Sequence, residues 1–219
     1  MNTQEIEIVF ANEKLTLNNQ RCLFWKRKIM LVLSDLHLGK AAHFRKSGIA
    51  IPKLVTVDDL NRLENLLIHY SPEELVIVGD LVHAETNKEI NLFNILASKF
   101  PTIRIVLVRG NHDRFSNEQL VAMGINEVLN VFQADPISFS HNFVTELDSH
   151  WIVGHIHPGV RIEMPTKRFM RLPCFVVTDT HIVLPAFSRF TGLDTQYNMS
   201  KKAKYFAFDE KTIFKIEHF

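Results

Sequence analysis

The first half of the chain alternates short apolar runs with longer stretches whose apolar residues recur at helical spacing. Residues 29–34 (IMLVLS), 75–78 and 103–108 are apolar runs of the length expected for strands buried on both faces. Leucines spaced for one helical face predict a helix over residues 57–69, and a similar pattern predicts another over residues 87–99. The strand–helix–strand–helix–strand order indicates parallel strands joined by right-handed crossovers.

The remaining pattern is typical of β-structure. Apolar and polar residues alternate over residues 5–17 around a turn at residues 11–13, which predicts a hairpin. Beyond residue 125, short β-rich runs separated by turn residues favour a second, more antiparallel sheet. These runs cover residues 127–132, 137–140, 151–153, 174–178, 181–184, 205–208 and 212–216. We expect an α/β fold with two sheets face to face and helices outside, an α/β/β/α sandwich, formed by residues 1–219 as a single domain.

Composition and charge narrow the classes of protein. The 219 residues are 46% hydrophobic and 22% charged, as in globular proteins, and the formal net charge of +1 argues against coating nucleic acid by charge alone. A local basic patch that binds nucleic acid around a cleft stays an open alternative. No apolar stretch is long enough to cross a membrane, and the N-terminus lacks the features of a secretion signal, so we expect a cytoplasmic protein without membrane association. Cys22 and Cys174 are expected to be buried thiols. The sequence contains no CxxC pair, so a zinc site with thiolate ligands is not expected.

Polar residues that can bind metals follow the predicted buried strands. Such residues at the carboxyl ends of parallel strands lie where open α/β sheets place their ligand crevices. Since side chains on an extended segment alternate in direction, Asp35 and His37 are expected on one side, as are His155 and His157. Glycines at the same strand ends allow sharp turns and close approach of the backbone. They are Gly79, Gly110 and Gly154.

The chemistry of these side chains indicates a two-metal site. Carboxylate, amide and imidazole ligands without a thiolate suit divalent Mn, Fe or Zn. Seven ligands are too many for one tetrahedral ion but suit two ions that share a bridging carboxylate, typically ~3.5–4 Å apart, in enzymes of phosphoryl transfer. The candidate ligands are Asp35, His37, Asp80, Asn111, His141, His155 and His157.

The ordered motifs DLH, GD, GNHD, an isolated histidine and GHIH resemble those of the calcineurin-like metallophosphoesterase superfamily. Four runs, SDLHLGKAAHFRKSGIAIP (34–52), GDLVH (79–83), GNHDR (110–114) and RLPCF (171–175), are similar to the ligase-associated DNA-damage-response endonuclease subfamily. Members of that subfamily are described as Mn-dependent enzymes that act on DNA. The resemblance therefore implies two divalent ions, Mn before Fe or Zn, and a DNA substrate.

The superfamily resemblance also implies a role for each motif residue. Asp35, His37 and His157 would bind the first metal, Asn111, His141 and His155 the second, and Asp80 would bridge both. A hydroxide held between the ions would attack phosphorus. His112 would protonate the leaving oxygen or stabilise charge on the phosphoryl group, and Asp113 would orient His112.

Several residues near the motifs are candidates for substrate contacts, with an ordinary solvated surface as the alternative for each. They are His83, Arg114, Lys40 and Arg45, with His43 and Lys46 beside them. A small basic cluster, Lys167, Arg168 and Arg171, follows the last metal motif. It is either a nucleic-acid-binding edge or an ordinary loop.

Three functions stay open at this point. The first is a DNA phosphodiesterase or endonuclease in a repair context, for which the resemblance implies DNA ligase or helicase partners. The second is a phosphatase or phosphodiesterase for small molecules such as nucleotides or nucleotide sugars. The third is a non-catalytic scaffold of the same fold, which the presence of His112 and of every candidate ligand disfavours. The sequence does not indicate an oligomeric state.

Overall fold

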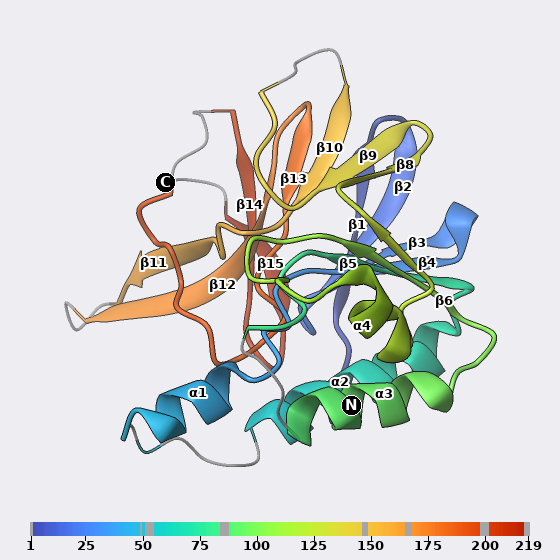
Figure 1. Cartoon of the computed structure of the whole chain (residues 1–219). Helices are drawn as coiled ribbons and strands as arrows, with labels where there is room; N and C mark the ends of the chain where they lie inside the picture. Colours follow the sequence, from blue (N-terminus) through green and yellow to red (C-terminus); the bar gives the residue numbers. More distant parts are fainter. Residues whose placement is uncertain are drawn as a thin grey trace.

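Two β-sheets packed face to face form the centre of the structure, and the helices lie beyond one of them (Figure 1). The structure is a computed structural model that describes residues 2–48, 50, 55–83, 88–145, 149–164, 168–197 and 202–216. This arrangement confirms the predicted fold class.

The first sheet has seven strands in sequence order, β1 to β7. The predicted N-terminal hairpin is formed by β1 and β2, and the three predicted buried strands are β4, β5 and β6. Strands β4 to β6 run parallel, as the strand–helix order predicts. The run predicted over residues 127–132 in the second sheet is instead divided between the sheets: β7 joins the first sheet parallel to β6, and β8 belongs to the second. The bounds are β1 (Glu5–Phe10), β2 (Glu13–Asn18), β3 (Leu23–Trp25), β4 (Met30–Leu33), β5 (Glu74–Val78), β6 (Arg104–Val108) and β7 (Glu127–Leu129).

Both predicted long helices are present, as α2 (Val55–Tyr70) and α3 (Lys88–Ser98); Asn87, the first residue predicted for the second, lies outside the described residues. Two shorter helices, α1 (Lys40–Lys46) and α4 (Asn117–Ala122), and a 3-10 helix, η1 (Lys26–Lys28), complete the helical set of the described residues. Ser116 and Gln119 form a capping box at the start of α4, a signal already present in the sequence. Within the described residues, every helix is too short or too polar to span a membrane.

The second sheet is mixed, and most of its strand pairs are antiparallel, as the sequence predicts. Its order is β15-β14-β12-β13-β10-β9-β8, and β10 runs parallel to both β9 and β13. Within the described residues, β11 pairs with β12 alone and forms a hairpin with it. The bounds are β8 (Val131–Ala134), β9 (Ile137–Ser140), β10 (His150–Val153), β11 (Gly159–Glu163), β12 (Phe169–Val177), β13 (His181–Val183), β14 (Lys204–Phe208) and β15 (Ile213–Ile216).

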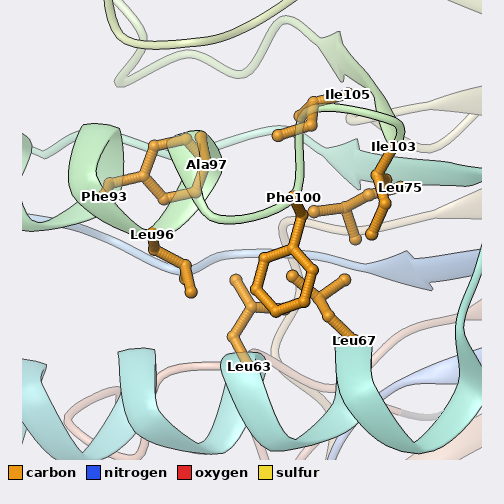
Figure 2. A pocket seen from close by; sticks show the side chains of 9 residues that line it. All are labelled: Leu63, Leu67, Leu75, Phe93, Leu96, Ala97, Phe100, Ile103 and Ile105. Atoms are coloured by element: carbon orange, nitrogen blue, oxygen red, sulfur yellow. The ribbon is translucent and has the colours of Figure 1, made fainter.

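Alternating side chains divide the core into layers. Val76 and Val106 of the first sheet pack with Phe139 and Phe175 of the second between the two sheets. The opposite face of the first sheet packs against α2 and α3. There, Figure 2 shows the Phe100 side chain directed toward helix α2, at a small apolar pocket. The outer face of the second sheet carries its own apolar cluster, over which the described residues place no helix.

Candidate metal centre

The loops that carry the first candidate ligands leave neighbouring strands at one edge of the first sheet. Because β4, β5 and β6 are parallel, their carboxyl ends lie together, and the loops begin there. The main chains of two loops are joined directly: Asp35 N donates to Gly79 O (3.1 Å) and His37 N donates to Asp80 O (2.9 Å). The ligand-bearing segments are therefore held to one another by backbone hydrogen bonds.

The residues converge for a different reason than the expected strand alternation. Asp35 (φ 58°) and His37 (φ 51°) lie beyond the end of β4 and both have left-handed backbone conformations. His155 (φ 70°) and His157 (φ 54°) repeat the pattern, and Asp80 has φ 51°. Such angles are uncommon for residues other than glycine, and they cluster where surrounding structure over-determines a functional site. The extended geometry predicted for both pairs is thus wrong. Asp35 and His37 do reach the same group of ligand atoms, whereas His155 and His157 belong to different groups.

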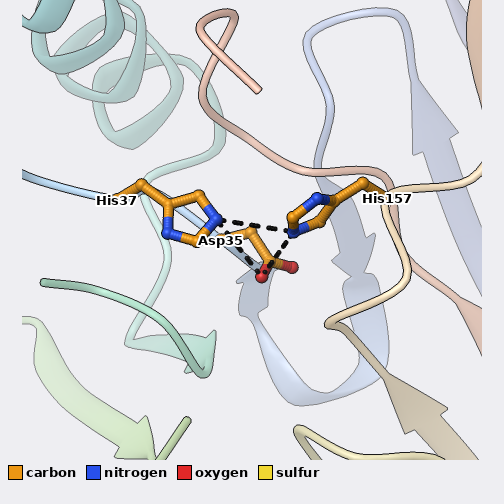
Figure 3. A group of neighbouring side chains, drawn as sticks. All are labelled: Asp35, His37 and His157. Carbon is orange, nitrogen blue, oxygen red and sulfur yellow. Dashed lines mark hydrogen bonds and ion pairs between the residues drawn. The ribbon is translucent and has the colours of Figure 1, made fainter. Parts of the chain in front are cut away.

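Asp35, His37 and His157 form a first group of ligand atoms (Figure 3). The distance from His157 Nε2 to Asp35 Oδ1 is 3.0 Å, and His37 Nε2 lies 3.4 Å from His157 Nε2 and 3.8 Å from Asp35 Oδ1. Among the described residues, the buried Asp35 Oδ1 has no hydrogen-bond partner, and the imidazole nitrogens of His157 and His37 lie beside it. A buried carboxylate oxygen without a hydrogen bond is costly, so this arrangement fits a bound cation.

Asp80, His141 and His155 form a second group. His141 Nε2 lies 3.2 Å from His155 Nδ1 and 3.5 Å from Asp80 Oδ2, and Asn111 Oδ1 is 3.1 Å away. The other ring nitrogen of His141 is 3.0 Å from the Val78 carbonyl, which can only accept, so Nδ1 carries a hydrogen. This bond orients the ring with Nε2 toward the group, as second-shell contacts orient metal-binding histidines.

The electrostatics of both groups also fit cations. Burial lowers the pKa of His37 to about 3, which keeps the imidazole in the neutral form that binds metals. Burial opposes ionisation of Asp35 and Asp80, yet neighbouring imidazoles hold the pKa of each carboxyl below its usual value. The pKa of His141 is raised to about 9, because Asp80 and Asp35 outweigh the effect of burial. The buried carboxylates thus require positive charge beside them, from a proton or from a metal ion.

Two of the predicted glycines are required by the packing of the site. A Cβ atom at Gly79 would lie 2.1 Å from His141 Nδ1, and Gly79 has φ +79°. A Cβ atom at Gly154 would lie 2.0 Å from Ser34 Oγ and 2.7 Å from Val78 O. Both distances are far below van der Waals contact, so only glycine allows the ligand loops to approach this closely.

His112 lies at the open side of the second group, and its side chain is 37% exposed. Its backbone N–H donates to Asp80 Oδ1 (2.9 Å), and its Nε2 is 4.0 Å from Asp80 Oδ2. Asp113, expected to orient His112, instead accepts hydrogen bonds from the backbone N–H groups of Val82 and Gly110, both at 2.9 Å. The Asp113 carboxylate therefore joins two site loops, and its described bonds do not include the His112 ring.

The structure brings some predicted substrate residues close to the metal groups. The His83 ring is 4.4 Å from the His112 ring and 5.4 Å from the His37 ring between centroids, and burial lowers its pKa to about 4. Burial also lowers the pKa of Lys40, against the opposing attraction of Asp35 and Asp80. Arg45 is half-buried on α1, Arg114 is exposed after the GNHD loop, and neither belongs to the two ligand groups. Lys167 of the predicted basic cluster lies outside the described residues, and its neighbours Arg168 and Arg171 are exposed.

One supporting segment was not predicted. Ser34 Oγ lies within hydrogen-bond distance of the Asp35 carboxylate and 2.7 Å from Val78 O. Phe187 N donates to Ser34 O (2.7 Å) and Ser188 N donates to Asp35 O (3.1 Å), so the segment after β13 supports the first ligand loop. No side-chain pattern indicated this segment, because its bonds to the ligand loop are made by backbone N–H groups.

The chain is similar in sequence and in structure to known proteins. The model of the calcineurin-like phosphoesterase family matches residues 30–168. Among solved structures, the nuclease MPE of Pseudomonas putida is 26% identical, with a TM-score of 0.78, over 93% of this chain and 96% of that chain.

Two further structures are more distant. Yfce, a phosphoesterase from E. coli, is 16% identical over 83% of this chain and 88% of that chain, with a TM-score of 0.41. The protein AQ665 from Aquifex aeolicus is 18% identical over 58% of this chain and 78% of that chain, with a TM-score of 0.42. These two similarities are too low to bear on function. No curated protein matches this chain by sequence.

Proposed function

This chain belongs to the calcineurin-like phosphoesterase family and is a metal-dependent phosphoesterase, and we propose that it is a two-metal phosphodiesterase that cleaves DNA strands. The observation that carries the two-metal part is the pair of adjacent ligand groups, whose members are joined through the backbone of their loops. The nuclease similarity over nearly the whole chain supports a nucleic-acid substrate.

Each group has a proposed occupant. Asp35, His37 and His157 would hold one divalent ion. Asp80, His141 and His155, with the amide oxygen of Asn111, would hold the other. Asp80 is the proposed bridge. Two such ions, when bound, polarise the phosphoryl group and activate water as its nucleophile. We propose Mn, with Fe or Zn as alternatives, because oxygen and nitrogen ligands without thiolates suit all three.

The contact between the two groups supports their action as one centre. His155 N, from the second group, donates to Asp35 Oδ2 (3.1 Å) in the first. His37 N, from the first group, donates to the carbonyl of Asp80 in the second. A shift of either loop would therefore disturb both sets of ligands, which supports a common role in binding and orienting one phosphoryl group.

His112 is the proposed proton donor to the leaving oxygen. Its backbone is fixed by Asp80, and its ring is partly exposed at the side of the centre open to a substrate. The His83 ring packs beside the His112 ring. We propose that His83 limits the motion of His112 and contacts the substrate. A proton held at His112 Nε2 would neutralise the departing alkoxide of a nucleic-acid strand, whose expulsion is otherwise slow.

The biological setting of the proposal follows from the motif resemblance described above. We propose that the DNA is a repair substrate and that a DNA ligase or helicase acts with this enzyme. A matched test is cleavage of DNA with unpaired ends, in the presence and absence of a ligase or helicase from the same organism. Unchanged rates with every such partner would remove the partner proposal while leaving the nuclease proposal intact.

The deciding experiment compares substrates on protein stripped of metal and reconstituted with Mn. Bis-p-nitrophenyl phosphate, p-nitrophenyl phosphate and labelled single-stranded DNA are tested with the unaltered chain, with His112→Ala and with His69→Ala. His69 is exposed on α2 and serves as the matched histidine control. The proposal is supported if the unaltered chain and His69→Ala cleave both DNA and the diester, while His112→Ala loses DNA cleavage and keeps more of its turnover of the diester. Turnover of the monoester without DNA cleavage would indicate a small-molecule phosphatase, and absence of turnover with Mn, Fe and Zn would indicate a scaffold.

A further inference from the structure

Strands β11 and β12 form a hairpin that projects from the body of the molecule (Figure 1). In its register, Arg161 of β11 lies directly opposite Arg171 of β12, and both side chains belong to exposed residues. Like charges at directly opposite positions destabilise a strand pair. Within the described residues, neither guanidinium forms an ion pair with a carboxylate. The hairpin therefore keeps an unfavourable pair of positive charges in the absence of a ligand.

An aromatic ring lies on the same face of the hairpin. Phe169 is opposite Glu163, two positions along from the arginine pair, so its side chain shares their face. Phe169 is 48% exposed, and the Arg161 guanidinium carbon lies 3.4 Å from the centroid of its ring. This contact holds one guanidinium in place over an exposed aromatic surface. Positive charge and an accessible ring thus occur together, as on surfaces that bind single-stranded nucleic acid.

The other face of the hairpin is anchored in the protein. Val160 and Leu172, a cross-strand pair, are buried in the apolar cluster on the outer side of the second sheet. Cys174 N also donates to Pro158 O (3.1 Å), which extends the pairing to the start of the hairpin. Because one face is fixed by burial, the register that opposes the two arginines is fixed as well.

The hairpin follows the ligand His157 directly along the chain and is joined to it by backbone hydrogen bonds through Asp194. β11 begins two residues after His157, and Asp194 N donates to His157 O (3.0 Å) while Gly159 N donates to Asp194 O (2.9 Å). Arg161 is four residues beyond His157, which is at most ~13 Å of extended chain at ~3.3 Å per residue. A nucleic-acid strand carries a phosphate about every 3.4 Å along a helix axis, so this distance corresponds to a few nucleotides.

We propose that Arg161, Arg171 and Phe169 form a binding site for single-stranded nucleic acid beside the scissile phosphate, an inference that rests on the proposed function. The two guanidinium groups bind neighbouring phosphates, and their mutual repulsion is relieved when the phosphates lie between them. The Phe169 ring, with Arg161 on it, stacks against an unpaired base. Bases in a duplex do not expose the faces that such stacking requires, so the site selects single strands.

The test uses three variants of the full chain: Arg161→Gln/Arg171→Gln, Phe169→Ala and Lys26→Gln/Lys28→Gln. The last pair removes the same charge from η1, which precedes β4 at the sheet edge opposite the metal centre. Binding of labelled single-stranded and duplex DNA is measured in the His112→Ala background across a salt series. Cleavage is measured with His112 intact, as the ratio of kcat/KM on single-stranded DNA to turnover of bis-p-nitrophenyl phosphate by the same preparation.

We expect the arginine double variant and Phe169→Ala each to weaken single-strand binding roughly 10-fold or more and to lower the cleavage ratio to match. Loss of two phosphate contacts should reduce the slope of log K against log salt by about 1.4, whereas Phe169→Ala should leave this slope unchanged. Because the repulsion between the two arginines is removed, the Tm of the arginine double variant should equal or exceed that of the unaltered chain. The lysine control should match the parent in affinity, slope and ratio.

Other outcomes overturn the inference and identify its error. If the unaltered chain cleaves single-stranded DNA and the hairpin variants bind and cleave it equally well, the hairpin site is wrong and the proposed function stands. If affinity for duplex falls as much as affinity for single strands, the single-strand selectivity is wrong. If the unaltered chain turns over the small diester but neither binds nor cleaves DNA, both the nuclease proposal and the hairpin site are wrong.

Discussion

The buried Arg62 guanidinium donates a hydrogen bond to the Phe187 carbonyl and lies 4.2 Å from the centroid of the Phe187 ring. Arg62 also pairs with Asp59 at 2.9 Å, and Asp59 accepts from Arg189 N. Since Phe187 N in turn donates to Ser34 O, this buried pair supports the loop that holds Asp35. An ion pair within α2 is therefore connected to the metal centre through one short segment.

We predict that Arg62→Met lowers the free energy of unfolding and weakens metal retention. The substitution leaves Asp59 as an uncompensated buried charge, which typically costs about 3–5 kcal/mol. Denaturant unfolding and metal content of the reconstituted protein measure the two effects. Lys99→Met is the control, because its exposed pair with Glu64 should contribute less than about 1 kcal/mol. Equal small losses in both variants would show that the buried pair does not support the site.

Gly154→Ala should disrupt the site, although it adds only a methyl group. The new Cβ would lie 2.0 Å from Ser34 Oγ, so the loop carrying His155 must move away from Asp35. We expect a loss of about 1–3 kcal/mol in the free energy of unfolding, as for other overpacked positions, together with reduced metal binding. Gly192→Ala is the matched control, because no atom of the described residues lies within 4 Å of its Cβ position. Wild-type stability and metal content in Gly154→Ala would contradict this packing.

Asp80→Ala tests the proposed bridge through metal content rather than activity. Loss of the bridging carboxylate should reduce bound Mn from two ions per chain to fewer than one, as measured by elemental analysis after desalting. Asp58→Ala, which removes an exposed carboxylate from α2, should keep both ions. Retention of two ions by Asp80→Ala would mean that each group binds its ion without a shared ligand.

His112→Ala should slow turnover without changing metal content, because the His112 ring belongs to neither ligand group. A general acid contributes typically 10²–10⁴-fold, and most where the leaving group is a poor one. The loss should therefore be much larger for cleavage of a DNA alkoxide than for release of p-nitrophenolate. Equal losses for both leaving groups would argue against proton donation by His112.

The two cysteines should be unreactive in the folded protein. Burial raises the pKa of both Cys22 and Cys174 to about 12, so almost no thiolate is present near neutral pH. Ellman's reagent should detect no thiol in the native chain and two after denaturation. Rapid reaction of either thiol in the native protein would contradict the burial of these positions.

The strands and the identity of the candidate ligands could be predicted from the sequence because their signals are local. A run such as MLVL in β4 is buried on both faces, so its composition alone indicates a strand. The polar residues just beyond such runs then lie at one edge of the sheet, whatever the details of the loops. The family assignment rests on the order of these short motifs, which needs no knowledge of the fold.

Contacts between distant residues could not be predicted in this way. Arg62 and Phe187 are 125 positions apart, and nothing in either local pattern indicates that they meet. The Asp113 carboxylate bonds to Val82 N rather than to its neighbour His112, because the loops after β5 and β6 pack together. The opposition of Arg161 and Arg171 likewise depends on a register that burial of the other hairpin face selects.

The sequence by itself thus determined which side chains are available to bind metals and in what order they follow the strands along the chain. The tertiary structure alone decided how they converge, through left-handed backbone at Asp35, His37 and Asp80 and through hydrogen bonds between loops. The physical reason is that burial on both faces of a strand is encoded residue by residue. A strained loop conformation persists only where many distant contacts hold it, and those contacts exist only after the chain has folded.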